Sequence, residues 1–354
     1  MCVSDSERDS EDAAPNGFEI QKEAIPQTLP LPNYLQMMML VANGALLGMP
    51  PENARLNMTP DQKKAWSQDG LIVVPGALPG PRLELLKARV RQFYGRFVSG
   101  EISNYSLDSE TASCMPDLWQ KLLAYPRDRQ TFKRWNIVSD GADFIDLVDH
   151  KPVFDLIVEI MGANIQVSRA QMIVIPQGVQ EQAFLHTDSG TLGQCFSAPG
   201  CVPLMVSVQY FLTDLEGENE GNFAYVPGSQ HTPFPEEEGN PGGGQTSGFT
   251  QGVNLPGRTQ VRIRAGDAVI FPHSLWHGAS LNNGEKARLS LIYGYSPLFV
   301  RPYDYVSQPD HVLAECRSFR QRRLLGDFGS WAWRPGCLHH PAPDQDQIIR
   351  MGAG

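Results

Sequence analysis

The spacing of apolar residues changes once along this chain, near Gly162, and this change constrains the fold more than any other feature. Before Gly162, apolar residues recur at steps of three or four positions, which is typical of amphipathic helices. After Gly162, short runs of β-branched and aromatic residues are bounded by Gly, Pro, Asn or Asp, which is typical of strands. Helices followed by many short strands predict an α+β chain whose β part is a sandwich or barrel.

The helices have separate local signals. Residues 34–47 form the first apolar helical stretch, and Thr59-Pro60-Asp61-Gln62 is a capping box with proline at the first helical position. Apolar residues at helical steps then predict a helix from Pro81, namely Leu83, Leu86, Val90, Phe93 and Phe97. A further helix is expected over 152–161, closed by Gly162. Residues 71–76 (LIVVPG) predict a short strand and turn.

Six strands are expected after Gly162. They cover residues 165–175, 204–212, 223–226, 260–263, 268–272 and 287–295. A long Gly/Pro/Glu-rich loop separates His231 from Gly257, and loops of this length are usually functional or disordered. We interpret this 232–257 loop as a lid over a substrate pocket, with a disordered insertion as the alternative.

The charge and cysteine content exclude several classes of protein. The net charge is −10 with no long basic run, which argues against nucleic acid as a partner. Six cysteines without a CxxC pair do not suggest a disulfide framework. A zinc cluster at Cys337, His339 and His340 lacks a second paired-ligand element. No signal peptide or membrane span is evident, so a cytoplasmic protein is expected, with a flexible acidic and Pro-rich tail over 1–33.

The segment Phe184-Leu185-His186-Thr187-Asp188-Ser189-Gly190 resembles half of a metal site. In an extended chain, His186 and Asp188 share one face while Thr187 points to the other. Imidazole and carboxylate belong to the facial triad that binds non-haem Fe(II) and leaves positions open. A surface hydrogen-bonded pair is the ordinary alternative, so a second histidine is required.

The segment Phe271-Pro272-His273-Ser274-Leu275-Trp276-His277-Gly278 supplies two further histidines. His277 lies beside Gly278, where a small residue lets another group approach, whereas His273 is interpreted as a structural neighbour and His231 as a turn residue. Arg288 follows His277 by eleven residues, on the same strand face as Ser290. A guanidinium and a hydroxyl there could bind a carboxylate.

These motifs together resemble the phytanoyl-CoA dioxygenase family of Fe(II)/2-oxoglutarate oxygenases. The resemblance runs from about Met58 to Pro302 and rests on TPDQKKAWSQDGLIVVPGAL, HTD, ENEGNFAYVPGSQH and WHGASLNNGEKARLS. It implies a double-stranded β-helix, or jelly roll, over about 163–300, with N-terminal helices packed on one sheet. A single oxygenase domain would then cover 34–330, followed by a C-terminal tail over 331–354.

The resemblance also implies the roles of individual residues. His186, Asp188 and His277 would bind Fe(II), while Arg288, together with Ser290, would bind the far carboxylate of 2-oxoglutarate. Arg169 and Gln171 are both candidates for a further cosubstrate residue. Dioxygen would be consumed and succinate and CO2 released. Because Asp188 is present, oxygen insertion is favoured over halogenation.

The expected activity is oxidation, foremost hydroxylation, of a small organic molecule in natural-product or amino-acid-like metabolism. An acyl-CoA hydroxylase of the same family and a non-catalytic binding protein on the same scaffold are the alternatives. A cupin-type isomerase or hydrolase would have no use for Arg288. No nucleic acid or membrane partner is expected, and a homodimer is left open.

Overall fold

The structure, a computed structural model, describes residues 58–104, 125–162, 164–178, 185–188, 203–232, 257–302 and 304–327. The chain divides into two compact units, Met1–Ala42 and Asn43–Gly354, and every described residue belongs to the second. The predictions for the two tails, for the helix over 34–47, for Cys337, His339 and His340, and for most of the 232–257 loop lie outside the described residues.

The helices with clear sequence signals are found where they were expected. They are α2 (Pro60–Gln68), α3 (Gly80–Val98) and α7 (Lys151–Met161). In α2, the Thr59 hydroxyl accepts from the Gln62 backbone while the Gln62 side chain accepts from the Thr59 backbone, so the predicted capping box is confirmed. Three shorter helices follow at α6 (Ala142–Ile145), α8 (Asp310–Glu315) and α9 (Phe319–Leu324).

The strands form two antiparallel sheets. The larger sheet has the order β1 (Ile72–Val74), β8 (Ala268–Pro272), β5 (Val206–Phe211), β10 (Arg288–Pro297), β3 (Ile165–Ile175) and β2 (Phe132–Arg134). The smaller sheet has the order β4 (Leu185–His186), β9 (His277–Ala279), β6 (Phe223–Tyr225) and β7 (Thr259–Gln260). Two antiparallel sheets with helices on one of them confirm the predicted α+β jelly-roll class.

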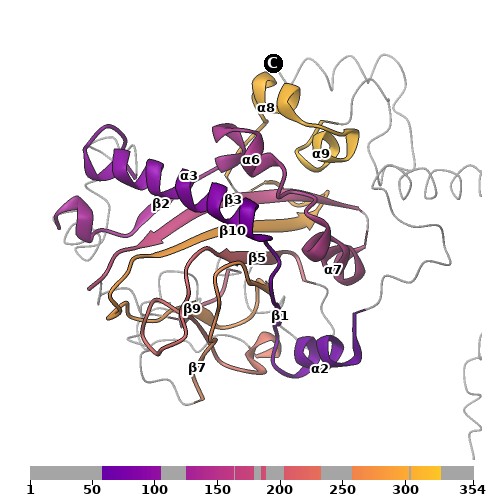
Figure 1. The fold of residues 1–354 in the computed structure, drawn as a ribbon. Helices are drawn as coiled ribbons and strands as arrows, with labels where there is room; N and C mark the ends of the chain where they lie inside the picture. Colours follow the sequence, from indigo (N-terminus) through magenta and orange to yellow (C-terminus); the bar gives the residue numbers. More distant parts are fainter. Residues whose placement is uncertain are drawn as a thin grey trace, which may run out of the picture. The chain divides into compact units, whose positions relative to one another are not determined.

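The helices α3, α6, α8 and α9 lie on one side of β3 and β10 of the larger sheet, whereas α2 lies apart from them (Figure 1). The apolar positions of α3 are buried in a core that also contains Leu291 and Tyr293 of β10. The Tyr293 hydroxyl donates to the Phe144 carbonyl of α6, which satisfies a polar group in this core. Because side chains alternate along a strand, Arg288, Ser290 and Gly294 of β10 face the other way, towards the inside of the jelly roll.

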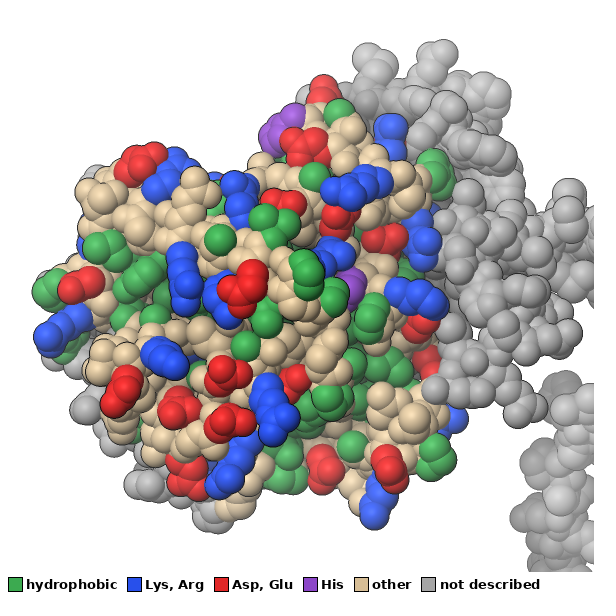
Figure 2. Space-filling view, in the orientation of Figure 1, with side chains coloured by type: hydrophobic (Ala, Val, Ile, Leu, Met, Phe, Trp, Pro, Cys, Tyr) green, Lys and Arg blue, Asp and Glu red, His purple; other side chains and the backbone are tan. Residues whose placement is uncertain are grey.

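A second apolar cluster lies between the two sheets. It contains Phe211, Phe223 and Phe271, with Leu71, Leu215, Tyr225, Ile263, Val269 and Leu275 around them. On the face shown in Figure 2, acidic and basic side chains are interspersed without a continuous basic patch. Among the residues that the structure describes, no helix combines the length and apolar character needed to cross a bilayer.

Three strands have no counterpart among the expected ones. They are β2, β4 and β9, which have three, two and three residues. Strands this short contain at most one alternation of side chains, so periodicity cannot reveal them. The expected strand over 260–263 is also reduced to β7 (Thr259–Gln260), because Ile263 makes only an isolated bridge to Leu215.

Candidate metal centre

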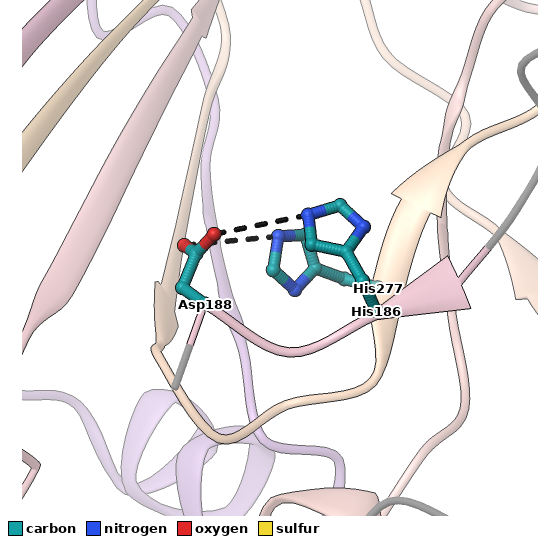
Figure 3. A group of neighbouring side chains, drawn as sticks. All are labelled: His186, Asp188 and His277. Atoms are coloured by element: carbon teal, nitrogen blue, oxygen red, sulfur yellow. Dashed lines mark ion pairs between the residues drawn. The ribbon is translucent and has the colours of Figure 1, made fainter. Parts of the chain in front are cut away.

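The smaller sheet brings the two histidines of the predicted triad together. In the antiparallel pairing of β4 with β9, His186 lies directly opposite His277, and their ring centroids are 4.5 Å apart. Asp188 follows the end of β4, where its backbone N–H donates to the His273 carbonyl at 2.8 Å. Figure 3 shows the Asp188 carboxylate pointing towards both imidazole rings.

The three side chains present a compact set of metal-binding atoms. One ligand atom from each residue lies within 4.8 Å of the others. The Nε2 atom of His186 is 3.7 Å from Asp188 Oδ1, and the Nε2 atom of His277 is 3.9 Å from Asp188 Oδ2. Two imidazoles and one carboxylate are the donor set of the facial triad. The His186 side chain is 28% exposed.

The protonation states suit a divalent metal. Burial and the neighbouring His277 lower the pKa of His186 to about 3, and burial also lowers the pKa of His277. Burial by itself would raise the pKa of Asp188, but the charge of Arg169 and the two histidines outweigh it and lower that pKa. At neutral pH the set is therefore two neutral imidazoles and an ionised carboxylate, the forms that bind metal.

The orientation of His277 is set by its surroundings. Its Nδ1 lies 2.9 Å from the Leu275 carbonyl, which can only accept, so Nδ1 carries the proton and Nε2 keeps its lone pair for a metal. The Phe223 ring stacks on the imidazole at 5.6 Å between centroids and 7° between planes. The Phe271 ring lies 4.5 Å away on another side. His277 is therefore held in one orientation without a bound ion.

Arg288 and Ser290 lie on the inward face of β10, as expected. Arg288 is 4% exposed, its guanidinium lies 5.2 Å from the centre of the Phe211 ring, and its Nη2 donates to Ser290 Oγ at 3.0 Å. Ser290 Oγ also accepts from Gln209 Nε2 at 3.0 Å. Burial lowers the pKa of Arg288 to about 9, so the side chain stays cationic at neutral pH.

No carboxylate among the described residues pairs with Arg288, and its Nε has no hydrogen-bond partner there. A buried cation is costly unless an anion compensates it. Gly221 is close behind the stem, since a Cβ at Gly221 would lie 3.1 Å from the Cβ of Arg288. This arrangement fits an anionic ligand that reaches the guanidinium from the inside of the jelly roll.

The structure separates Arg169 from Gln171, the two candidates on β3. Arg169 is engaged with Asp188, at 2.7 Å from Nη2 to Oδ2 and 3.3 Å from Nη1 to Oδ1. Gln171 is 5% exposed, and within the described part of the chain its Nε2 has no hydrogen-bond partner. The Arg169 guanidinium is thus engaged with the carboxylate of Asp188, whereas Gln171 presents an amide donor for a ligand.

Three polar residues of this region were missed by sequence reasoning: Lys133, Ser207 and Gln209. Lys133 lies opposite Ile173 in the register of β2 with β3, and Ser290 lies opposite the same residue from β10. Burial lowers the pKa of Lys133; the charges of Arg169 and Arg288 lower it further, while the charge of Asp188 raises it. No local motif marks these residues, because only sheet register brings them to the site.

His231 and His273, the two histidines that were not expected to be ligands, lie outside the triad. His231 is exposed and ends the 3₁₀ turn Ser229–His231, whose first two residues are buried. His273 is 1% exposed, and its carbonyl accepts the Asp188 backbone N–H. The PGSQH turn also supports the centre indirectly, because Ser229 Oγ accepts from the Trp276 backbone, one residue before His277.

Comparison with known proteins agrees with the geometry. The family model described as phytanoyl-CoA dioxygenase matches residues 66–290, more than half of the chain. The dioxygenase cdmA of Talaromyces verruculosus is 26% identical over 146 residues, which are 41% of this chain and 42% of that protein. The dioxygenase olcK of Penicillium canescens is 21% identical over 286 residues, 78% of this chain and 81% of olcK.

Among solved structures, HygX from Streptomyces hygroscopicus with nickel, 2-oxoglutarate and hygromycin B bound has a similar fold. The TM-score is 0.51 at 17% identity, and the match covers 70% of this chain and 90% of HygX. Fold, triad geometry and family model therefore agree: the chain belongs to the phytanoyl-CoA dioxygenase family and is an Fe(II)/2-oxoglutarate-dependent dioxygenase.

Proposed function

We propose that this dioxygenase hydroxylates a small organic molecule, with His186, Asp188 and His277 binding Fe(II) and with release of succinate and CO2. The observation that carries the proposal is the convergence of three ligand atoms within 4.8 Å, from two paired strands and the loop after one of them. The neutral histidines and the ionised carboxylate fit a divalent iron ion. Three protein ligands leave further coordination positions for cosubstrate and dioxygen.

When bound, Fe(II) and 2-oxoglutarate supply the oxidative chemistry, which the cofactors carry and the protein directs. Arg288 binds the far carboxylate of 2-oxoglutarate, because it is a buried cation without a carboxylate partner among the described residues. Ser290 adds a hydroxyl that Arg288 and Gln209 already orient. Gln171 contributes an amide donor along the same inward face.

The proposed substrate is a natural-product or amino-acid-like molecule. HygX, which shares the fold, has been crystallised with hygromycin B, a small molecule. An acyl-CoA substrate is the second candidate within the family, but the net charge of −10 and the interspersed charges on the face in Figure 2 do not favour a polyphosphate ligand. The non-catalytic alternative predicts a degraded triad, whereas all three residues converge.

The test begins with anaerobic addition of Fe(II) and 2-oxoglutarate to folded protein. We expect a weak visible charge-transfer band, and a protein that stays colourless while folded would contradict the cofactor assignment. A panel of candidate substrates is then screened for succinate release above the uncoupled background. Mass spectrometry of each positive reaction should show a product heavier by one oxygen atom. A product of another mass would refute hydroxylation but not the cofactor assignment.

A further inference from the structure

Arg169 contacts the metal centre through its guanidinium. Its Nη2 lies 2.7 Å from Asp188 Oδ2 and its Nη1 lies 3.3 Å from Asp188 Oδ1, so one guanidinium contacts both carboxylate oxygens. The same Nη2 donates to Ser207 Oγ at 2.7 Å. The side chains of Arg169 and Asp188 are only 10% and 6% exposed. A two-point contact of this kind fixes the plane of a carboxylate as well as its position.

The position of the Arg169 side chain depends on a glycine in the neighbouring strand β10. Strand β10 lies between β3 and β5, and Gly294 is the β10 residue opposite both Arg169 and Ser207. A Cβ at Gly294 would lie 3.2 Å from Arg169 Cβ, 3.4 Å from Arg169 Nε and 3.0 Å from Met205 Sδ. Gly294 does not have a positive φ, so the backbone does not require glycine there. The requirement is for space.

Because Gly294 has no side chain, the Arg169 side chain can pass over the inward face of β10 at this position. The guanidinium emerges beside Ser207 on β5 and meets Asp188 in the loop after β4. The His186 and His277 Nε2 atoms approach the same carboxylate at 3.7 and 3.9 Å. The Asp188 carboxylate thus lies beside a cation and beside both Nε2 atoms. A carboxylate that is free to rotate could not hold one oxygen in a constant position next to these two nitrogen atoms.

We propose that Arg169 is a positioning residue for Asp188, held by Ser207 across the gap at Gly294, and that it sets the affinity and geometry of the metal centre. This inference rests on the proposed role of Asp188 as an iron ligand. It also assigns Arg169 to the carboxylate ligand and not to 2-oxoglutarate. A buried ion pair is weak evidence for stability but can define one arrangement of polar groups. Outer partners of metal ligands typically contribute ten- to about a hundredfold in metal affinity.

Three substitutions test the inference by separate routes. Arg169→Lys keeps the charge but removes the two-point contact. Gly294→Ala changes no polar group and displaces Arg169 by filling the gap. Ser207→Ala removes only the hydroxyl that holds Nη2. Ser296→Ala is the matched control for Ser207→Ala, because Ser296 is a buried serine of the same sheet that donates to Ser168.

Metal affinity is measured without turnover, by Mn(II) electron paramagnetic resonance in the absence of 2-oxoglutarate. We expect Arg169→Lys and Gly294→Ala to weaken binding about 10- to 100-fold, Ser207→Ala to weaken it a few-fold, and Ser296→Ala to leave it unchanged. With Fe(II) saturating, the 2-oxoglutarate concentration for half-maximal charge-transfer absorbance should be unchanged in all four variants.

Wild-type metal affinity in folded Arg169→Lys would overturn the inference. So would a selective rise in the 2-oxoglutarate requirement, which would return Arg169 to the cosubstrate. If Gly294→Ala does not fold, Ser207→Ala against Ser296→Ala still decides the matter, because equal metal affinity in these two overturns it. Failure of the wild-type protein to bind metal would instead contradict the proposed function.

Discussion

The two sheets of this protein differ in length, in packing and in what they contribute. The larger sheet contains β3 with eleven residues and β10 with ten, and its outward side chains pack against helices. The smaller sheet is built from strands of two or three residues and carries His186 and His277. The larger sheet thus supplies most of the apolar burial, and the smaller one supplies the metal ligands. If this division holds, substitutions in the larger sheet should change mainly the stability, and substitutions in the smaller sheet should change mainly metal binding.

The largest effect is expected from removing a metal ligand of the smaller sheet. His186→Ala should weaken metal binding more than about a hundredfold, since even outer partners of ligands cost up to about that much. Thermal unfolding should change little, because His186 is partly exposed. The charge-transfer absorbance and the release of succinate are measured, and both should be absent in this variant. His231→Ala, at an exposed histidine, is the matched control, and equal behaviour of the two variants would remove His186 from the centre.

The complementary change removes a side chain from the core of the larger sheet. Leu291 of β10 is fully buried against the helices, so Leu291→Ala should cost about 2–5 kcal/mol in the free energy of unfolding. Metal affinity of the molecules that remain folded should stay near that of wild type. Denaturant unfolding and Mn(II) titration measure the two quantities. A parallel loss of both would show that the sheets are not separable.

A substitution of Arg288 tests whether the larger sheet binds 2-oxoglutarate. Arg288→Lys keeps a cation but loses the planar donor pair, so the requirement for 2-oxoglutarate should rise about 10- to 100-fold, or about 1.4–2.8 kcal/mol. Metal affinity without 2-oxoglutarate should be unchanged. Arg264→Lys, at a side chain 80% exposed, is the control. An unaltered cosubstrate dependence would refute the role of Arg288.

The smallest expected effect concerns Asp304, whose carboxylate accepts from the Ala170 and Asn136 backbones. Burial raises the pKa of Asp304 from 3.8 to about 6. The folded protein therefore holds this proton more tightly than the unfolded chain, so the contribution to stability is complete below about pH 4 and is lost as pH rises through about 6. Between pH 5 and pH 7 the loss should be about 1 kcal/mol.

Asp304→Asn keeps an acceptor and removes this titration. The unfolding free energy of this variant, relative to that of the wild type, should therefore increase between pH 5 and pH 7. A constant difference between the two proteins over that interval would contradict the raised pKa. Melting curves at closely spaced pH values are sufficient to decide.

The same division explains how much of the molecule could be predicted from sequence. The five buried positions of α3 and the strand β8 follow from periodicity, because long regular elements repeat their pattern. His186, Asp188 and His277 were recognised by motif and spacing, and the structure brings them together. The strands β4 and β9 that present the histidines were not predicted, since two or three residues have no period.

Long-range register accounts for what remained open. The choice between Arg169 and Gln171 depends on which residue lies opposite Gly294, next to an irregularity in the pairing of β10 with β3. Lys133 reaches the same region only through the pairing of β2 with β3. Neither pairing leaves a local mark, because strand partners that lie far apart in the sequence are selected by the fold as a whole.

The shortness of the outermost strands of the larger sheet has a consequence for self-association. The sheet ends in β1 and β2, each of three residues, so little unpaired backbone is offered along either border. Past β2, the border of β3 is covered by side-chain bonds, in which Asp304 accepts from Ala170 and Tyr305 donates to the Val167 carbonyl. Within the described residues, the borders of this sheet therefore offer a second copy of the chain only short templates for strand addition, which disfavours edge-to-edge aggregation.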